Sequence, residues 1–270
     1  MELISKGQKT DIVMDSLETS IENTPDYIVV RTPSMPDYYS GNKVIFPQPA
    51  QSEQEFAKWI GLYRQKFDVP KQGFMHFTWD QNPAETDWTI YTKQGFTIFT
   101  GHTLSLQQIE KPARLNQQVR VRTIHWKQDF HSWKALHVDP HGSASIEYQQ
   151  RYWQMKGLKL QQFQEIFPGQ RWVIEQDGEL VADLGLYAIK DIARFHAPMV
   201  APKWRKKGYA TRLLYEAAVF AKKHWQVREM ILVSEVGSDA DRLYAQLGFI
   251  KIEDIGEATK VLPKEIQPSE

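Results

Sequence analysis

The sequence has no cysteine among its 270 residues. This absence excludes disulfide bonds, thiolate catalysis and cysteine-based metal sites. The chain also has no uninterrupted apolar run of the length that a bilayer-spanning helix needs. Its first residues, MELISKGQKTDIVMDSLE, lack the apolar stretch of a secretory signal. We therefore expect a soluble cytoplasmic protein.

The chain has no excess charge of either sign, because 33 Lys and Arg residues balance 33 Asp and Glu residues. Neutrality argues against nucleic acid or an acidic membrane as a partner. Hydrophobic residues make up 41% and aromatic residues 12% of the chain, a globular composition. The length fits one large domain or two small ones.

Strand-like segments alternate with amphipathic helices in the second half of the chain. Asp177-Gly178 lies between two strand patterns and predicts a hairpin. Apolar residues at helical spacing predict one helix through 210–221 and another that ends at Gly248. This alternation favours an α/β sheet covered by helices.

A basic stretch, PKWRKKGYATRLL at 202–214, marks the start of the first of these helices. A helix N-terminus presents amides without partners and a partial positive charge, so it favours a phosphate. Gly208 would let a phosphate approach the backbone, and Thr211 adds a hydroxyl. The stretch is neither a Walker loop nor a G-x-G-x-x-G loop. From these residues alone, a pyrophosphate site and a solvated basic loop both stay open.

Two segments carry a family resemblance. MVAPKWRKKGYATRLL at 199–214 resembles the acetyl-coenzyme A (acetyl-CoA) motif of the GCN5-related N-acetyltransferases (GNAT superfamily), V-x-P-x-x-R/Q-x-x-G-x-G/A. ADRLYAQLGF at 240–249 resembles the family's second motif, A-x-x-L-Y-x-x-L-G-F. The resemblance covers about 120–260 and implies an α/β fold, with a mixed, mostly antiparallel GNAT-type sheet flanked by helices.

The resemblance also implies roles for single residues. It implies that the pantetheine arm pairs with the backbone of Met199, Val200 and Ala201. It implies that the pyrophosphate is held by Arg205, Lys206, Lys207, Gly208, Tyr209, Ala210 and Thr211. Tyr244 matches the tyrosine that protonates the departing thiolate, the alternative being a core aromatic. Gly237 replaces an Asn of many members, so we expect Ser238 to cap the next helix and to offer its hydroxyl to pantetheine.

The general base is less defined. The strand before the basic loop, Arg194-Phe-His-Ala-Pro, has no carboxylate. His196 is the candidate, because imidazole titrates near neutral pH; a structural histidine is the equal alternative. Asp183, Glu235 or a water chain are further options.

Three histidines lie close together in sequence: His131, His137 and His141. Pro140 interrupts any helix that they share, and no second cluster of ligands accompanies them. We interpret them as loop histidines and expect no metal site.

The first half contains an echo of the second motif. Tyr91-Thr-Lys-Gln-Gly-Phe96 has the same spacing as Tyr244-Ala-Gln-Leu-Gly-Phe249, and a strand pattern follows each. The echo predicts a tandem arrangement, with a second, smaller α/β GNAT-like domain at the N-terminus; the alternative is a coincidence in a short pattern. The predicted organisation is a leader at 1–25, a degenerate GNAT-like domain without a coenzyme A motif at 26–112, and a catalytic domain at 118–262.

The expected activity is direct acetyl transfer from acetyl-CoA, as cosubstrate, to a primary amine. A small-molecule amine is the preferred acceptor, and a protein N-terminus or lysine stays open. We expect no metal, nucleic-acid or membrane partner, and a monomer or homodimer. The alternative function is a non-catalytic coenzyme A-binding sensor or scaffold module.

Overall fold

The computed structural model describes residues 1–17, 19–82 and 86–262. The chain forms two compact units. The N-terminal unit holds residues 1–103, 233–236 and the chain from 251 onward. The C-terminal unit holds residues 104–232 and 237–250. Both units therefore combine segments that lie far apart in sequence.

The N-terminal unit is an α/β unit whose strands have the order β1-β2-β3-β4-β11. Only β3 and β4 pair in parallel; the other neighbours are antiparallel. β5 begins here and ends in the C-terminal unit. The elements are α1 (Lys6–Asp15), β1 (Ser20–Asn23), β2 (Ile28–Arg31), η1 (Tyr39–Gly41), β3 (Lys43–Phe46), α2 (Glu53–Lys66), α3 (Val69–Gln72), β4 (Phe74–Trp79), α4 (Thr89–Thr92), β5 (Thr97–Leu106) and β11 (Ile250–Val261).

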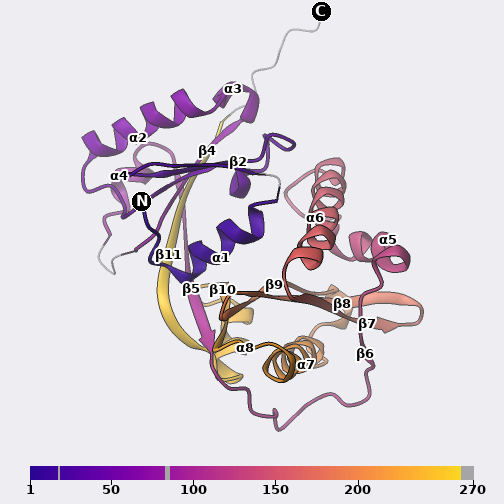
Figure 1. Ribbon diagram of the computed structural model, residues 1–270. Helices are drawn as coiled ribbons and strands as arrows, with labels where there is room; N and C mark the ends of the chain where they lie inside the picture. The colour runs from indigo at the N-terminus through magenta and orange to yellow at the C-terminus, as the bar shows by residue number, and fades with distance from the viewer. Residues whose placement is uncertain (18, 83–85, 263–270) are drawn as a thin grey trace, which may run out of the picture. The chain divides into compact units, whose positions relative to one another are not determined.

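Helices cover both faces of these strands (Figure 1). Ser52 caps α2 by accepting a hydrogen bond from the amide of Glu55, as the sequence predicts. Phe56, Trp59 and Tyr63 recur at helical spacing and form the buried face of α2. On the opposite face, Ile12 of α1 packs against a smaller apolar cluster of β2 and β3.

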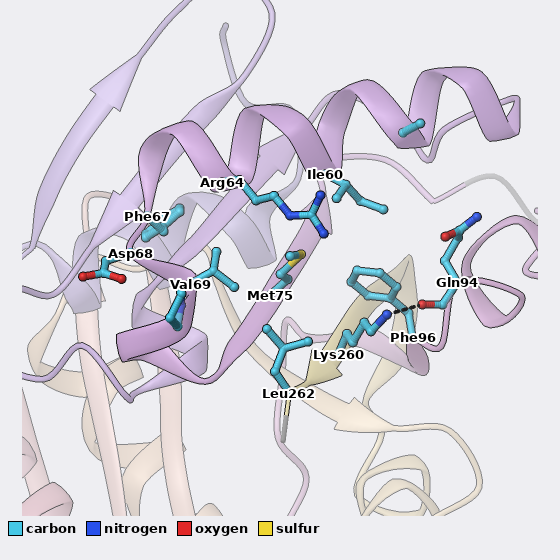
Figure 2. A pocket seen from close by; sticks show the side chains of 12 residues that line it. Ile60, Arg64, Phe67, Asp68, Val69, Met75, Gln94, Phe96, Lys260 and Leu262 are labelled. Atoms are coloured by element: carbon cyan, nitrogen blue, oxygen red, sulfur yellow. Dashed lines mark hydrogen bonds between the residues drawn. The ribbon is translucent and has the colours of Figure 1, made fainter. Parts of the chain in front are cut away.

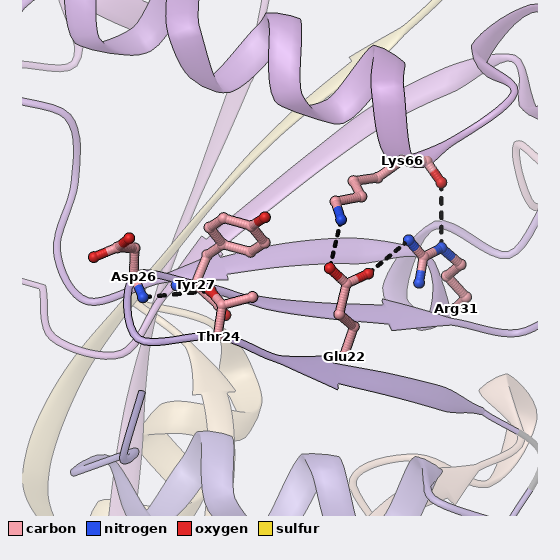
Figure 3. A network of polar contacts seen from close by, with 6 residues as sticks. All are labelled: Glu22, Thr24, Asp26, Tyr27, Arg31 and Lys66. Carbon is pink, nitrogen blue, oxygen red and sulfur yellow. Dashed lines mark hydrogen bonds and ion pairs between the residues drawn. The ribbon is translucent and has the colours of Figure 1, made fainter.

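A charged network ties α2 to the strand edge (Figure 3). Glu22 of β1 accepts hydrogen bonds from Lys66 and from Arg31. Arg31 also donates to the carbonyl of Lys66, with Nε and O 3.2 Å apart. One carboxylate therefore joins the edge strands to the end of α2.

The C-terminal unit has the strand order β10-β9-β8-β7-β6. β9 and β10 pair in parallel, and the other neighbours are antiparallel. Figure 1 shows α7 on one face of β7–β9 and α5 and α6 on the other. The elements are β6 (Val121–Thr123), α5 (Trp126–His137), α6 (Ile146–Ile166), β7 (Gly169–Gln176), β8 (Glu179–Ile189), β9 (Ile192–Val200), η2 (Pro202–Trp204), α7 (Tyr209–His224), β10 (Glu229–Glu235) and α8 (Asp239–Gln246).

The packing of β8 follows from its alternation. Leu184 and Leu186 face the apolar side of α7, where Leu213, Ala217 and Ala221 are buried. The intervening side chains, such as Asp183, are buried without joining this cluster. In a strand that is covered on both faces, the side chains that point to either face are buried.

The predicted fold class is confirmed: both units are α/β, and strands of mixed, mostly antiparallel pairing are flanked by helices. Two features were not predicted. The first 25 residues, interpreted as a leader, contain α1 and β1. The helix α5 begins at Trp126, and its N-cap residue His125 makes no side-chain cap, so its sequence carries no start signal.

Candidate active site

The start of α7 has backbone amides without partners. Its N-cap is Gly208, with φ of 78°, and no side chain caps the helix or supplies an acid in the first turn. By contrast, Ser5, Ser52, Ser145 and Ser238 each cap a helix by accepting an amide hydrogen bond. Within the described chain no residue accepts from the amides of 209–211. This end of α7 is therefore suited to an anion.

The loop before α7 is held by polar contacts. The side chain of Asn116 donates to the carbonyl of Lys207 over 2.9 Å, and Arg212 donates to the carbonyl of Asn116 over 2.9 Å. Lys206 has φ of 60° and Gly208 has φ of 78°, so two of three consecutive loop residues adopt the left-handed conformation. Such turns direct amides into a common concavity.

A cavity of about 630 Å³ opens at this helix start, within the C-terminal unit. Most of the residues that the resemblance assigns to acetyl-CoA line it: Met199, Val200, Arg205, Lys206, Gly208, Tyr209, Ala210 and Thr211. Lys207 does not line the cavity; its ammonium lies over the ring of Trp204, 4.2 Å from the centroid. Ala201 and Ser238 are also outside the lining. Ser238 instead accepts from the amide of Asp241 as the cap of α8.

Two parallel strands separate beside the cavity. β9 and β10 pair only through Ile192, Ala193 and Arg194 of β9. β9 then continues to Val200, paired only with β8 among the described strands of this unit. Its free edge includes Met199 and Val200, which line the cavity. An edge of this kind can pair with an extended amide-containing ligand.

Tyr244 brings a hydroxyl to the cavity. It lies on α8, is 6% exposed, and lines the cavity. No described residue hydrogen-bonds its hydroxyl. Burial raises the pKa of Tyr244 to about 12, so the phenol keeps its proton at neutral pH.

A buried ion cluster surrounds Asp183 of β8, a residue that is also part of the cavity lining. Asp183 is fully buried and accepts from Arg171 Nε at 2.9 Å and from Trp133 Nε1 at 2.7 Å. His137 Nε2 lies 3.0 Å from Asp183 Oδ1, without hydrogen-bond alignment. Burial opposes the charge of Asp183, but Arg171 and His137 outweigh it and lower the pKa of Asp183 to about 2. Asp183 is thus an ion-pair partner and too weak a base for the role that the sequence left open to it.

His196 lies at the edge of this cluster. Its Nδ1 is 3.3 Å from Arg171 Nη1, and its side chain is half-buried. Burial, followed by the cations Lys156 and Arg171, holds the pKa of His196 well below its usual range. Unlike Tyr244, His196 does not line the cavity.

Two of the three clustered histidines lie on a helix and not in the loop that we expected. His131 and His137 are on α5 and not in a loop, because Pro140 follows the end of that helix. The pattern missed the burial of His137, since only the fold brings Asp183 against it. Over the described residues, no group of three or more potential ligands is arranged to hold a metal ion. No helix in that part of the chain is long and apolar enough to cross a membrane.

The N-terminal unit has the order strand–loop–helix–strand–helix–strand in β3, α2, β4, α4 and β5, with the short helix α3 between α2 and β4; the same order occurs in β9, α7, β10, α8 and β11. The turn after α4 matches the turn after α8: the Phe96 amide donates to the Tyr91 carbonyl over 3.2 Å, and the Phe249 amide donates to the Tyr244 carbonyl over 3.1 Å. Gly95 precedes Phe96 at φ of 77°, just as Gly248 precedes Phe249 at φ of 88°. The sequence echo therefore marks the same local structure twice.

The region that corresponds to the cavity is closed in the N-terminal unit. The amide of Ala50 donates to the Tyr91 hydroxyl over 2.7 Å. β3 and β4 stay paired to Phe46, and the amide of Asp80 bonds the Phe46 carbonyl beyond their last pair. The start of α2 is capped by Ser52 and carries acidic residues. The cap and the acidic first turn make this helix start unsuited to a phosphate.

The N-terminal unit has a cavity of about 660 Å³ elsewhere, at the C-terminal end of α2 (Figure 2). Apolar side chains such as Phe67, Met75 and Leu262 line it, together with Arg64 and Lys260. Lys260 donates to the carbonyl of Gln94 over 2.7 Å. Its place, away from the start of α2, distinguishes it from the cavity at α7.

Comparisons with known proteins agree with this architecture. The family model "Acetyltransferase (GNAT) family" matches residues 123–249. No curated protein matches the chain. A conserved protein of unknown function from Staphylococcus epidermidis ATCC 12228 has a TM-score of 0.72 at 13% identity, over 92% of this chain and 96% of that one.

Two further solved structures have related folds. A GCN5-related N-acetyltransferase from Kribbella flavida has a TM-score of 0.65 at 13% identity, over 95% of this chain and 96% of that one. A tandem GNAT protein from the clavulanic acid biosynthesis pathway has a TM-score of 0.57 at 14% identity, over 96% and 88%. Residues 123–249 thus belong to the GNAT acetyltransferase family, in a chain whose fold fits a tandem form of that family.

Proposed function

We propose that the chain is an acetyl-CoA-dependent N-acetyltransferase that transfers the acetyl group directly to a primary amine. The observation that carries the proposal is the uncapped start of α7, which opens on the cavity that also contains Tyr244. An anion-binding helix end and a protonated phenol in one cavity suit a diphosphate-bearing thioester.

The residues of the cavity divide the binding between them. The amides of 209–211 and the side chains of Arg205 and Lys206 would hold the diphosphate. The free edge of β9 at Met199 and Val200 would pair with the pantetheine amides. Lys207, which stacks on Trp204, and Ser238, which caps α8, would contribute to the shape of the site and not to direct contacts.

When bound, acetyl-CoA supplies an activated acetyl group, so the amine nitrogen forms an amide as the C–S bond breaks. Tyr244 would donate its proton to the leaving sulfur, because its pKa of about 12 keeps the phenol protonated. The amine loses one proton, and coenzyme A leaves as the thiol. No acetyl-cysteine intermediate can form in a chain without cysteine.

We further propose that the N-terminal unit is a degenerate GNAT-like copy that binds no coenzyme A. The capped start of α2, with Glu53 and Glu55 in its first turn, would repel a phosphate. The Tyr91 hydroxyl is already engaged by Ala50. A small-molecule amine remains the proposed acceptor class.

The second candidate is a coenzyme A-binding sensor or scaffold. Two observations favour it. The strand β9 has no carboxylate that could act as the base, and the carboxylate of Asp183 on the neighbouring β8 is engaged by Arg171. Calorimetry with coenzyme A, followed by thiol release from acetyl-CoA with a panel of small amines, tests both candidates. Binding with amine-dependent turnover supports the enzyme, and binding without turnover for any amine supports the sensor. Failure to bind coenzyme A contradicts both.

A further inference from the structure

One guanidinium connects β7, β8 and β9 in the C-terminal unit. Arg171 of β7 has no exposed surface. It donates to Asp183 of β8 through Nε, at 2.9 Å, and through Nη2. Its Nη1 lies 3.3 Å from His196 Nδ1, and its Nη2 lies 3.4 Å from the carbonyl oxygen of Ala197. A single buried side chain thus contacts two consecutive residues of β9.

Ala197, the second of these residues, begins a bulge in β9 that also includes Pro198. Between the pairs Asp183–Met199 and Gly185–His196, β9 has one residue more than β8. Ala197 takes φ of 44°, a conformation that costs an L-residue free energy and persists only where neighbours hold it. Pro198 and Met199 follow at once and line the cavity at α7. Arg171 therefore supports the segment that gives β9 its direction beside the cavity.

The same contact determines where His196 carries its proton. A guanidinium has only donors, so Nδ1 of His196 must be the acceptor. A neutral imidazole that accepts at Nδ1 has its hydrogen on Nε2. The remaining nitrogen of His196 is then a donor, with no lone pair to receive a proton.

The charges around His196 favour this neutral form. They come from every packed element: Lys156 on α6, His137 on α5, Arg171 on β7 and Arg194 on β9, with the ring of Tyr187 on β8 in edge contact. Burial and these cations keep the pKa of His196 well below its ordinary value. The carboxylate of Asp183 on β8 is the negative group of this cluster, and it pairs with Arg171 and accepts from Trp133.

We propose that Arg171, anchored by Asp183, is a positioning residue of the acetyl transfer that fixes the β9 bulge and holds His196 as an Nε2–H hydrogen-bond donor. His196 is then not the general base, because Arg171 engages its Nδ1 and its Nε2 carries a hydrogen; water takes the proton of the amine. This inference rests on the proposed acetyltransferase function.

Side-chain ¹⁵N NMR of the histidines in the intact protein tests the tautomer directly. His196→Gln identifies the His196 signals. We expect the Nε2–H tautomer in the wild type, with no protonation between about pH 8 and 5.5. An Nδ1–H tautomer, or a titration midpoint near the ordinary histidine value, would overturn the proposal. This readout needs no activity, so it is separate from coenzyme A binding, which tests the proposed function.

Kinetics of Arg171→Lys test the positioning role. Lysine keeps the charge opposite Asp183 but loses the planar fork. We expect kcat to fall about tenfold or more, coenzyme A affinity to stay within about threefold, and His196 to begin titrating. Arg122→Lys is the matched control, because Arg122 also pairs with carboxylates, Asp129 and Glu175, and none of its described hydrogen bonds reaches β9. Equal losses in both variants would contradict the proposal.

His196→Gln tests whether His196 is the base. Glutamine retains an N–H donor but cannot accept a proton, so a His196 that is not the base predicts a fall in kcat of less than about tenfold with an unchanged pH profile. Loss of a general base costs about 100-fold or more and removes the acidic limb of the profile. The second result would overturn the proposal.

Discussion

The hydroxyl of Tyr91 accepts a hydrogen bond from the backbone amide of Ala50 at 2.7 Å. Tyr244, its counterpart in the repeated turn, has no such bond within the described chain and instead lines the cavity at α7. The two tyrosines share local backbone geometry, but the Tyr91 hydroxyl is hydrogen-bonded to a backbone amide, whereas Tyr244 lines a cavity. One copy of the turn therefore stabilises its unit, and the other is available for chemistry.

Exchange of each tyrosine for phenylalanine should separate these roles. We expect Tyr244→Phe to lower kcat about 100-fold, with coenzyme A affinity unchanged, because the leaving sulfur loses its proton donor. Tyr91→Phe should leave kcat unchanged and lower the free energy of unfolding by about 1–3 kcal/mol, since the Ala50 amide loses its acceptor. Thiol-release kinetics and urea denaturation measure both. Equal kcat for wild type and Tyr244→Phe would refute the assigned role.

A negative charge at the start of α7 should have opposite effects on stability and binding. In Thr211→Asp, the carboxylate interacts favourably with the helix dipole and should raise the free energy of unfolding by about 0.5 kcal/mol without ligand. The same charge should weaken coenzyme A binding about tenfold or more, because it repels the diphosphate. Thr211→Asn controls for shape. If calorimetry finds similar affinities for the Asp and Asn variants, the diphosphate does not bind there.

The closed N-terminal copy predicts one coenzyme A per chain. Ser52 caps α2, and acidic residues occupy its first turn, so this helix start should repel a second diphosphate. Titration calorimetry should give a stoichiometry of one, and Ser52→Ala should leave that number unchanged. Two equivalents per chain would show that the N-terminal unit is not a degenerate copy.

Acid should destabilise the protein through His76. Its side chain is fully buried, and burial, with a contribution from Lys43, lowers its pKa to about 3. The unfolded chain takes up the proton below about pH 6.5, whereas the folded state stays neutral, so stability is lost as the pH falls from 6.5 toward 3. Glu257, 3.6 Å from Nε2, gives little compensation, because burial raises its own pKa.

The expected loss from His76 alone is about 3 kcal/mol between pH 6.5 and 4. In His76→Gln, the plot of unfolding free energy against pH should be flatter over this interval. The exposed His141→Gln variant is the control and should follow the wild type. Parallel curves for wild type and His76→Gln would mean that His76 is not held neutral.

Local sequence determined the parts of the site that depend on local geometry. Gly208, Arg205 and the helix that follows them are close neighbours in the chain, so spacing alone predicts a basic, uncapped helix start. The echo of Tyr91 in Tyr244 is also local, and both turns form as their shared pattern requires. The spacing of hydrophobic residues and the residue types of turns depend on a few neighbouring positions, so they can be recognised in the sequence.

Only the tertiary structure decided the surroundings of His196 and Asp183. Arg171 comes from β7, and Trp133 and His137 come from α5; the fold brings all three to one buried carboxylate. The strand register and the bulge at Ala197 determine which side chains form ion pairs with one another and which of them line the cavity. These are contacts between residues far apart in the chain, and no local pattern encodes them. The sequence by itself determined the helix end that suits a phosphate, and the fold determined the electrostatics of the groups beside it.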